Sequence, residues 1–189
     1  ETFNMSQSIF DVASCGADQV SPFWVYVEEE SITNLQGSES DLCAITVPDV
    51  YVDSSIPQEC LDEGCGFENN PFKTITRALE MIMPSEDNPT TIHLASGIYS
   101  PDTGESFPIN MISNVNIEGE NEETTILDAM QTNRVIFVEN CINNQFIDLT
   151  ITGGQSDLSH LPYMESIGAG MAIFFSNPTL INVFIFITI

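Results

Sequence analysis

The chain has 189 residues, enough for one domain or for one domain and part of another. Lys and Arg together number 3 and Asp and Glu number 28, which gives a formal net charge of −25. A protein that neutralises phosphates needs clustered Lys or Arg, so this charge excludes nucleic acid as a partner and argues against an anionic membrane surface. With 42% hydrophobic residues, the chain can still bury a sizeable core.

The charge and the cysteines favour an extracellular setting. Only 16% of the residues are charged, so the acidity reflects missing basic residues, and such a surface is best suited to salt or to divalent cations. Cys60 and Cys65 lie in a loop-like stretch where a local disulfide is expected, with half of a zinc site as the alternative. Cys141 lies in an apolar stretch and is expected to be a buried thiol. We therefore expect a secreted or cell-surface protein.

The two ends of the sequence indicate a fragment of a longer protein. The chain starts at Glu1 without an initiator Met or a signal-peptide pattern, and it ends inside the apolar run 183–189. That run is far shorter than the roughly 20 residues of a spanning helix, so no membrane insertion is predicted. Residues 1–47 are weakly patterned and represent an upstream segment or the remnant of a preceding domain, whereas residues 48–189 form a patterned body.

One helix is predicted within this body. A short strand is expected at 50–52, and a long loop follows it. The helix has Asn70 as its N-cap, Pro71 at its first position and Pro84 at its end. Its apolar stripe consists of Phe72, Ile75, Leu79 and Ile82, at spacings of three and four, and Lys73 and Arg77 lie on its other face.

Short strands are expected after the helix, because the apolar pattern changes from period 3.6 to period 2. The first of them ends at Gly97. The candidates are 92–94, 114–118, 125–127, 135–138, 146–152, 172–175 and 180–189. Turn residues separate them and no further helical stripe interrupts them, which indicates an all-β body.

Three of these strands overlay at a constant offset of 34 residues: 114–118, 148–152 and 182–186. Their apolar residues share the same parity, and a helix cannot bury alternate residues on one side, so the repeat predicts a β-solenoid. Asn114, Asp148 and Asn182 begin the three strands and are expected to form a ladder of hydrogen bonds between coils. The amphipathic helix precedes the first coils and is expected to cap them.

Several segments carry a family resemblance: 50–53, 70–75, 92–99, 108–109, 113–119 and 124–128, followed by 168–173 and 177–183. They resemble the DUF1565-type N-terminal module of right-handed parallel β-helix (pectin-lyase-like) proteins. The resemblance covers roughly residues 50–189, and it implies an all-β, right-handed parallel β-helix with an N-terminal capping α-helix. It is specific for fold and not for activity, since the superfamily includes polysaccharide lyases, glycoside hydrolases, adhesins and inert fibres.

No catalytic residue is predicted. The family implies that a lyase would hold calcium by carboxylates and use an Arg or Lys base, but Arg134 matches no lyase motif and is expected to form a structural ion pair. A glycoside hydrolase needs converging carboxylates, and Asp128, Asp148 and Asp157 come without a supporting motif. His160 lies in a loop without a recognisable partner.

Acidic loops form a candidate calcium site, because calcium accepts flexible oxygen ligands. The possible ligands are Asp102, Glu105, Glu118, Glu120, Glu122 and Glu123. The alternative is that these loops are solvated and bind no cation. No other cofactor is predicted.

Two aromatic residues are candidates for glycan binding. Phe184 follows Asn116 and Thr150 in the outward ladder of the predicted coils, and Phe186 lies beside it. Flat apolar rings of this kind stack on sugar faces. The alternative is that a long loop, another strand layer or a further coil covers both rings.

These observations predict an extracellular β-helix scaffold or adhesin-like module that binds polysaccharide or other extracellular matter, with no catalytic site in this part of the protein. The alternative is the N-terminal part of a polysaccharide lyase or glycoside hydrolase whose catalytic coils lie further on.

Overall fold

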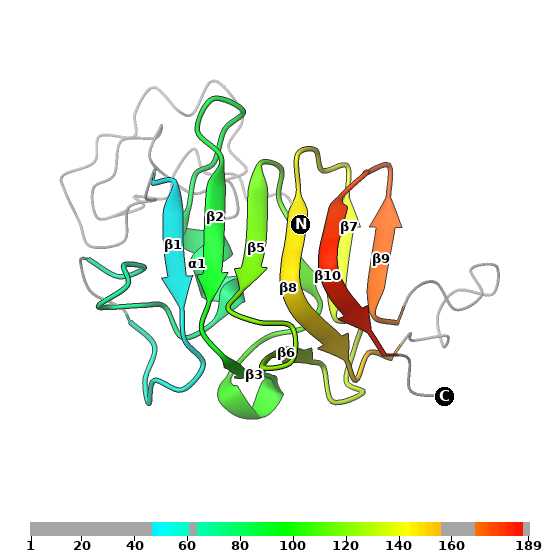
Figure 1. Cartoon of the computed structure of the whole chain (residues 1–189), viewed down its shortest axis with the longest axis horizontal. Coiled ribbons are helices and arrows are strands. Elements are labelled where there is room, and N and C mark those ends of the chain that lie inside the picture. The colour runs from blue at the N-terminus through cyan, green and yellow to red at the C-terminus, as the bar shows by residue number, and fades with distance from the viewer. Residues whose placement is uncertain (1–46, 61–63, 156–168, 187–189) are drawn as a thin grey trace, which may run out of the picture.

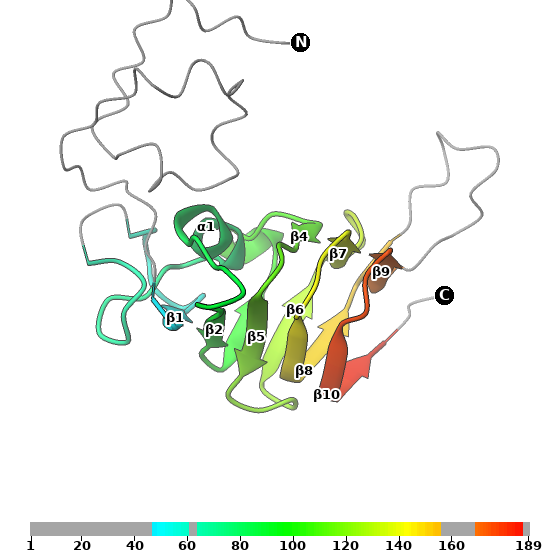
Figure 2. The same cartoon turned by 90° about the horizontal axis from the view of Figure 1, so that it is seen from above.

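A computed structural model describes residues 47–60, 64–155 and 169–186, and over these residues the chain is mostly β. The strands are β1 (Asp49–Val52), β2 (Thr90–Leu94), β3 (Gly97–Tyr99), β4 (Ile109–Asn110), β5 (Val115–Gly119), β6 (Thr125–Asp128), β7 (Ile136–Glu139), β8 (Gln145–Thr152), β9 (Met171–Phe174) and β10 (Thr179–Ile185). All of their pairings are parallel. They form a seven-stranded sheet and a three-stranded sheet of β4, β7 and β9 (Figures 1 and 2).

The long strand β8 joins two columns of stacked strands in the larger sheet. Its first half pairs with β5, which pairs with β2 and then β1, and these strands lie side by side in Figure 1. Its second half pairs with β6, which pairs with β3. Asp148 lies between the two halves and has a left-handed backbone, with a φ of 51°. β10 pairs with both halves of β8, so it follows the same path.

Apolar side chains at matching register positions form buried ladders between the strands. One ladder consists of Val50, Ile92, Ile117 and Phe146, all fully buried. A second consists of Tyr99, Leu127 and Ile151, also fully buried. Because alternate residues of a strand face opposite sides, these ladders fix which side of each strand belongs to the core. On β10 the first ladder continues with Leu180, which is 42% exposed.

The predicted overlay at 34 residues is right for the last two strands and wrong for the first. β10 pairs with the second half of β8 at that offset. β5 pairs with the first half of β8 instead, so that Ile117 lies against Phe146. Asn114 accordingly belongs to another ladder, in which Asn143 Nδ2, 29 residues later, donates to Asn114 Oδ1 at 3.0 Å. The turns between strands differ in length, so a fixed period misplaces the earlier strand.

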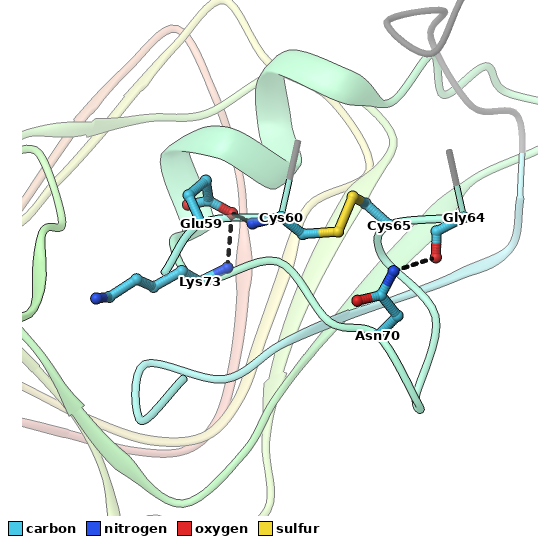
Figure 3. The surroundings of a disulfide bond; sticks show 6 residues. All are labelled: Glu59, Cys60, Gly64, Cys65, Asn70 and Lys73. Carbon is cyan, nitrogen blue, oxygen red and sulfur yellow. Dashed lines mark hydrogen bonds between the residues drawn. A yellow bond between two sulfur atoms is a disulfide. The ribbon is translucent and has the colours of Figure 1, made fainter. Parts of the chain in front are cut away.

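The helix α1 (Ile75–Met81) begins later than predicted. Its N-cap is Thr74, whose side chain accepts a hydrogen bond from the backbone N–H of Arg77 at 3.2 Å. Asn70, the predicted cap, instead donates its side-chain amide to the carbonyl of Gly64 at 3.1 Å (Figure 3).

The segment before α1 is extended because it pairs with β1. The N–H of Phe72 donates to the carbonyl of Tyr51, and the carbonyl of Phe72 accepts from the N–H of Asp53. Lys73 therefore precedes the helix instead of lying on its outer face, and its ammonium group donates to the carbonyl of Pro57 at 3.3 Å. All four residues of the predicted apolar stripe are nevertheless buried. The helix contacts β1 and β4, the first strand of each sheet, at one end of the structure (Figure 2).

Two short strands were not predicted. Gly97 begins β3 instead of ending a strand, and β4 has only two residues. Several predicted features lie outside the described residues: the upstream segment up to residue 46, the strand end 187–189, Asp157 and His160. None of the helices in the described ranges is long and apolar enough to cross a membrane.

Candidate functional site

The outward face of β1, β2 and β5 carries a cluster of polar side chains around His93. Val50, Ile92 and Ile117 point into the core, so their neighbours point outward. Register pairs Tyr51 with His93 and His93 with Glu118, which is one of the predicted calcium ligands. Asp49 lies two residues before Tyr51 on the same face of β1. We call these four residues, Asp49, Tyr51, His93 and Glu118, the His93 face.

The imidazole of His93 lies between two carboxylates. Its Nε2 is hydrogen-bonded to Asp49 Oδ1 at 2.8 Å, and its Nδ1 lies 3.6 Å from Glu118 Oε2. The ring of Tyr51 stacks on it, with ring centroids 5.1 Å apart and an interplanar angle of 27°. The side chains of His93, Asp49 and Glu118 are 30%, 53% and 40% exposed, so a molecule from solvent can reach this cluster.

A row of neutral polar side chains runs beside the His93 face. Thr91, Asn116 and Gln145 follow Asp49 in register across β2, β5 and β8. Asn116 Nδ2 donates to Thr91 Oγ1 at 3.4 Å. Hydroxyl, amide and carboxylate groups next to an aromatic ring provide both hydrogen bonds and a stacking surface. The face is therefore suited to a hydroxylated ligand.

Sequence reasoning missed this site. Asp49 and His93 are 44 residues apart, and the parallel register alone brings them into contact. The only signal in the sequence is that Tyr51 and His93 each follow a core residue, Val50 and Ile92, by one position. That pattern predicts a contact between Tyr51 and His93 only when the register of β1 with β2 is known.

The predicted glycan-binding residues Phe184 and Phe186 lie along β10 and directly after it. Their side chains are 50% and 58% exposed, and their ring centroids are 6.4 Å apart. Phe184 follows Thr150 in register, as expected. Asn116 does not belong to the same ladder, because it pairs with Gln145. The two rings therefore form an accessible pair on the last described strand, and their role in glycan binding stays a prediction.

Glu105, one of the predicted calcium ligands, is hydrogen-bonded to the start of α1. The residue is buried, and its Oε2 accepts from the N–H of Ile75 at 2.6 Å. Its Oε1 accepts from the N–H of Thr76 at 3.1 Å and from the Thr76 hydroxyl at 2.6 Å. Burial raises the pKa of this carboxyl above its usual value, against the opposing effect of hydrogen bonds from Thr76, Ile75 and Ser106.

The other predicted calcium ligands are not gathered into one site. Asp102 is exposed in the 3-10 helix η4 (Pro101–Thr103). Glu120 Oε2 accepts from the N–H and the hydroxyl of Ser96 at 3.1 and 2.7 Å. Glu122 and Glu123 follow in the turn between β5 and β6. Within residues 47–60, 64–155 and 169–186, no group of three or more His, Cys, Asp or Glu could hold a metal ion. Calcium binding by the exposed carboxylates stays a prediction.

The structure joins Cys60 to Cys65 by a disulfide, with Cα atoms 5.8 Å apart (Figure 3). Glu59, next to this bond, holds the segment that leads into α1. Its Oε1 accepts from the N–H of Lys73 at 2.8 Å, and its Oε2 accepts from the hydroxyl of Thr74 at 3.0 Å. The disulfide loop therefore fixes a carboxylate against the start of the helix.

The remaining candidates have structural partners. Asn182 Nδ2 donates to Asp148 Oδ1 at 2.7 Å, so the predicted ladder exists between these two residues. Asp128 Oδ1 accepts from the N–H of Met130 at 2.8 Å. Cys141 is a buried free thiol, as predicted, and burial raises its pKa. These contacts give Asp148, Asp128 and Cys141 defined partners or surroundings in the fold.

The sequence model of one family, described as a protein of unknown function (DUF1565), matches residues 60–174, which is more than half of the chain. No curated protein and no solved structure matches the chain.

Proposed function

We propose a function on the premise that the chain belongs to the DUF1565 family, which is associated with the pectin-lyase-like β-helix superfamily. Its parallel strands stack as successive coils of a right-handed parallel β-helix, in which each coil contributes one or more strands. These coils form a non-catalytic extracellular scaffold that binds polysaccharide. The parallel pairing throughout and the stacked apolar ladders support the coil arrangement. Right-handed crossovers are the general rule between parallel strands.

The His93 face is the observation that carries the polysaccharide part of the proposal. It combines a stacked aromatic pair with two carboxylates on one accessible sheet face, and a row of hydroxyl and amide side chains runs beside it. A sugar polymer presents hydroxyl groups at its ring edges and apolar C–H groups on its ring faces, so it matches both kinds of surface.

An extracellular location fits the covalent and electrostatic character of the chain. Disulfides persist in oxidising compartments, and Cys60 and Cys65 are paired. The net charge of −25 keeps the chain soluble in the salt of an exterior medium, where the self-repulsion of its surface is screened.

Binding of the whole chain to a glycan array tests the proposal. We expect retention of one or more polysaccharides, with loss of binding in Tyr51→Ala. Phe175, 89% exposed and directly after β9 of the smaller sheet, provides the matched control Phe175→Ala, which keeps binding. A second variant, Phe184→Ala with Phe186→Ala, tests the predicted aromatic pair on β10. Absence of binding to every glycan would overturn the proposal.

A carbohydrate-active enzyme is the second candidate function, and one observation favours it. Asp49 and Glu118 stand on opposite sides of His93 on the same sheet face, and paired carboxylates are the usual acid and base of glycoside hydrolysis. Incubation of the chain with polysaccharides, followed by measurement of reducing ends and of unsaturated products, separates the two candidates. Product formation that Asp49→Asn abolishes would favour the enzyme.

A further inference from the structure

We infer that the polysaccharide recognised by the His93 face carries ammonium groups, as a polymer of amino sugars does, and not carboxylates. This inference rests on the proposed function and specifies the chemical class of its ligand. It comes from the distribution of charge around the face and from the groups that stand beside its two carboxylates.

The carboxylates of the His93 face have no Lys or Arg near them in the sheet. The three basic residues of the chain are Lys73, Arg77 and Arg134. Lys73 and Arg77 lie just before and within α1, and Arg134 precedes β7 of the smaller sheet. No Lys or Arg is therefore found on β1, β2, β5 or β8, so a cationic group from a ligand would share the two carboxylates with His93 alone among the basic residues of these strands.

The two carboxylates retain capacity to accept hydrogen bonds. An ionised carboxylate has two oxygens and about four acceptor positions. Asp49 uses Oδ1 for His93, and half of its side chain is exposed. Glu118 is 3.6 Å from the imidazole and is also accessible. An ammonium group brings three donors, and its bonds to carboxylates are charge-assisted, so each carboxylate can bind one.

A polymer of uronic acids has the opposite charge relationship with this face. Its carboxylates would approach Asp49 and Glu118 on a chain with a net charge of −25, and like charges repel. A bridging divalent cation would relieve the repulsion, but the described part of the chain has no cluster of ligands for one. An acidic polysaccharide is therefore disfavoured.

The aromatic and neutral groups distinguish a sugar polymer from a simple polyamine. The stacked rings of Tyr51 and His93 offer a flat surface, and the row beside it contains the hydroxyl of Thr91 and the exposed side-chain amide of Gln145. A polyamine has no ring faces to stack on the aromatic surface and no hydroxyl groups to bond with the neutral polar side chains. An amino sugar has both, together with the ammonium group that the carboxylates attract.

The test compares binding of the whole chain to three probes at about 0.15 M salt, where distant charges are screened. The probes are a deacetylated chito-oligosaccharide, its fully acetylated counterpart and polygalacturonate. We expect the deacetylated probe to bind at least about tenfold more tightly than the acetylated one, and polygalacturonate not to bind. The double variant Asp49→Asn with Glu118→Gln should lose most of that preference. Circular dichroism verifies that each variant is folded.

A matched control separates this site from general attraction of a polycation to an acidic protein. Asp102→Asn with Glu123→Gln removes the same charge from exposed residues elsewhere, and it should leave binding within about twofold of the parent chain. Equal losses in both double variants would overturn the inference. Acetylated or acidic probes that bind as tightly as the deacetylated one would overturn it as well, while the proposed function stands. No binding to any probe or to the glycan array would overturn both.

Discussion

The side-chain amide of Asn182 donates a hydrogen bond of 2.7 Å to the carboxylate of Asp148, 34 residues earlier in the chain. Both residues have a left-handed backbone, each with a φ of 51°. Asn and Asp tolerate this conformation better than other residues with side chains, because their short polar groups bond locally. Each of the strands β8 and β10 therefore turns a corner with a residue whose side chain also bonds to the neighbouring strand.

Asp148→Val should destabilise the chain by about 2 kcal/mol, because a β-branched residue resists a positive φ and the hydrogen bond to Asn182 is lost. Asp148→Asn keeps both the backbone preference and a hydrogen-bonding oxygen, so it should change stability by less than about 0.5 kcal/mol. The free energy of unfolding in urea gives both values. Equal losses in the two variants would contradict the role of the left-handed corner.

The apolar ladder predicts a graded response to truncation along one column. Ile117 is fully buried, so Ile117→Ala should cost about 2–5 kcal/mol. Leu180 occupies the same column on β10 but is 42% exposed, so Leu180→Ala should cost less than about 1 kcal/mol. Urea unfolding of the two variants measures the difference. A larger loss at Leu180 than at Ile117 would show that the register is wrong.

Glu105 should make stability depend on pH in an unusual direction for a carboxylate. Burial raises its folded-state pKa above the ordinary value of 4.5, so the folded chain holds this proton at a pH where the unfolded chain has released it. Its contribution to stability is therefore complete below the ordinary value and is lost as pH rises through the raised pKa. Relative to Glu105→Gln, the parent chain should lose stability between about pH 4 and the raised pKa.

The difference in unfolding free energy between the parent chain and Glu105→Gln, measured at several pH values, isolates this effect from other titrating groups. A difference that grows in favour of the parent chain as pH rises would contradict the prediction.

Loss of the disulfide should weaken the start of α1 as well as the loop it closes. Cys60→Ser with Cys65→Ser should cost about 2 kcal/mol from the short loop, on the chain-entropy model. Glu59 would then hold Lys73 and Thr74 less firmly. Hydrogen exchange should accordingly quicken at the amide of Lys73 more than at amides of β5. If hydrogen exchange quickened equally at the amide of Lys73 and at amides of β5, the disulfide would have no specific effect on the start of the helix.

The positions of most strands followed from the period-2 pattern, but their register did not. Stacked side chains lie 25 residues apart between Thr91 and Asn116, 29 between Asn114 and Asn143, and 34 between Asp148 and Asn182. Burial in the core determines which residues face inward, and the alternation of apolar and polar residues along each strand predicts this. The turns between the strands differ in length, so no constant repeat period predicts which residues pair.

The helix start and the His93 face depended on contacts from distant segments. Glu105, 30 residues after Ile75, supplies the acceptors at the first turn of α1, and no local pattern announces it. In the same way, His93 gains its partners from two other strands. The sequence therefore predicted the elements that depend on local periodicity and missed the groups that parallel pairing brings together.

The corner that Asp148 forms within β8 has other forms between the earlier strands. Residues 95–96 connect β2 to β3, residues 120–124 connect β5 to β6, and within β8 Asp148 alone makes the turn. The strands on both sides keep their parallel pairing whatever the connection. The connection of β5 to β6 is therefore an insertion point for protein engineering. An epitope or reporter peptide grafted between residues 120 and 124 would be displayed at the surface, while the strands on both sides keep their parallel pairing.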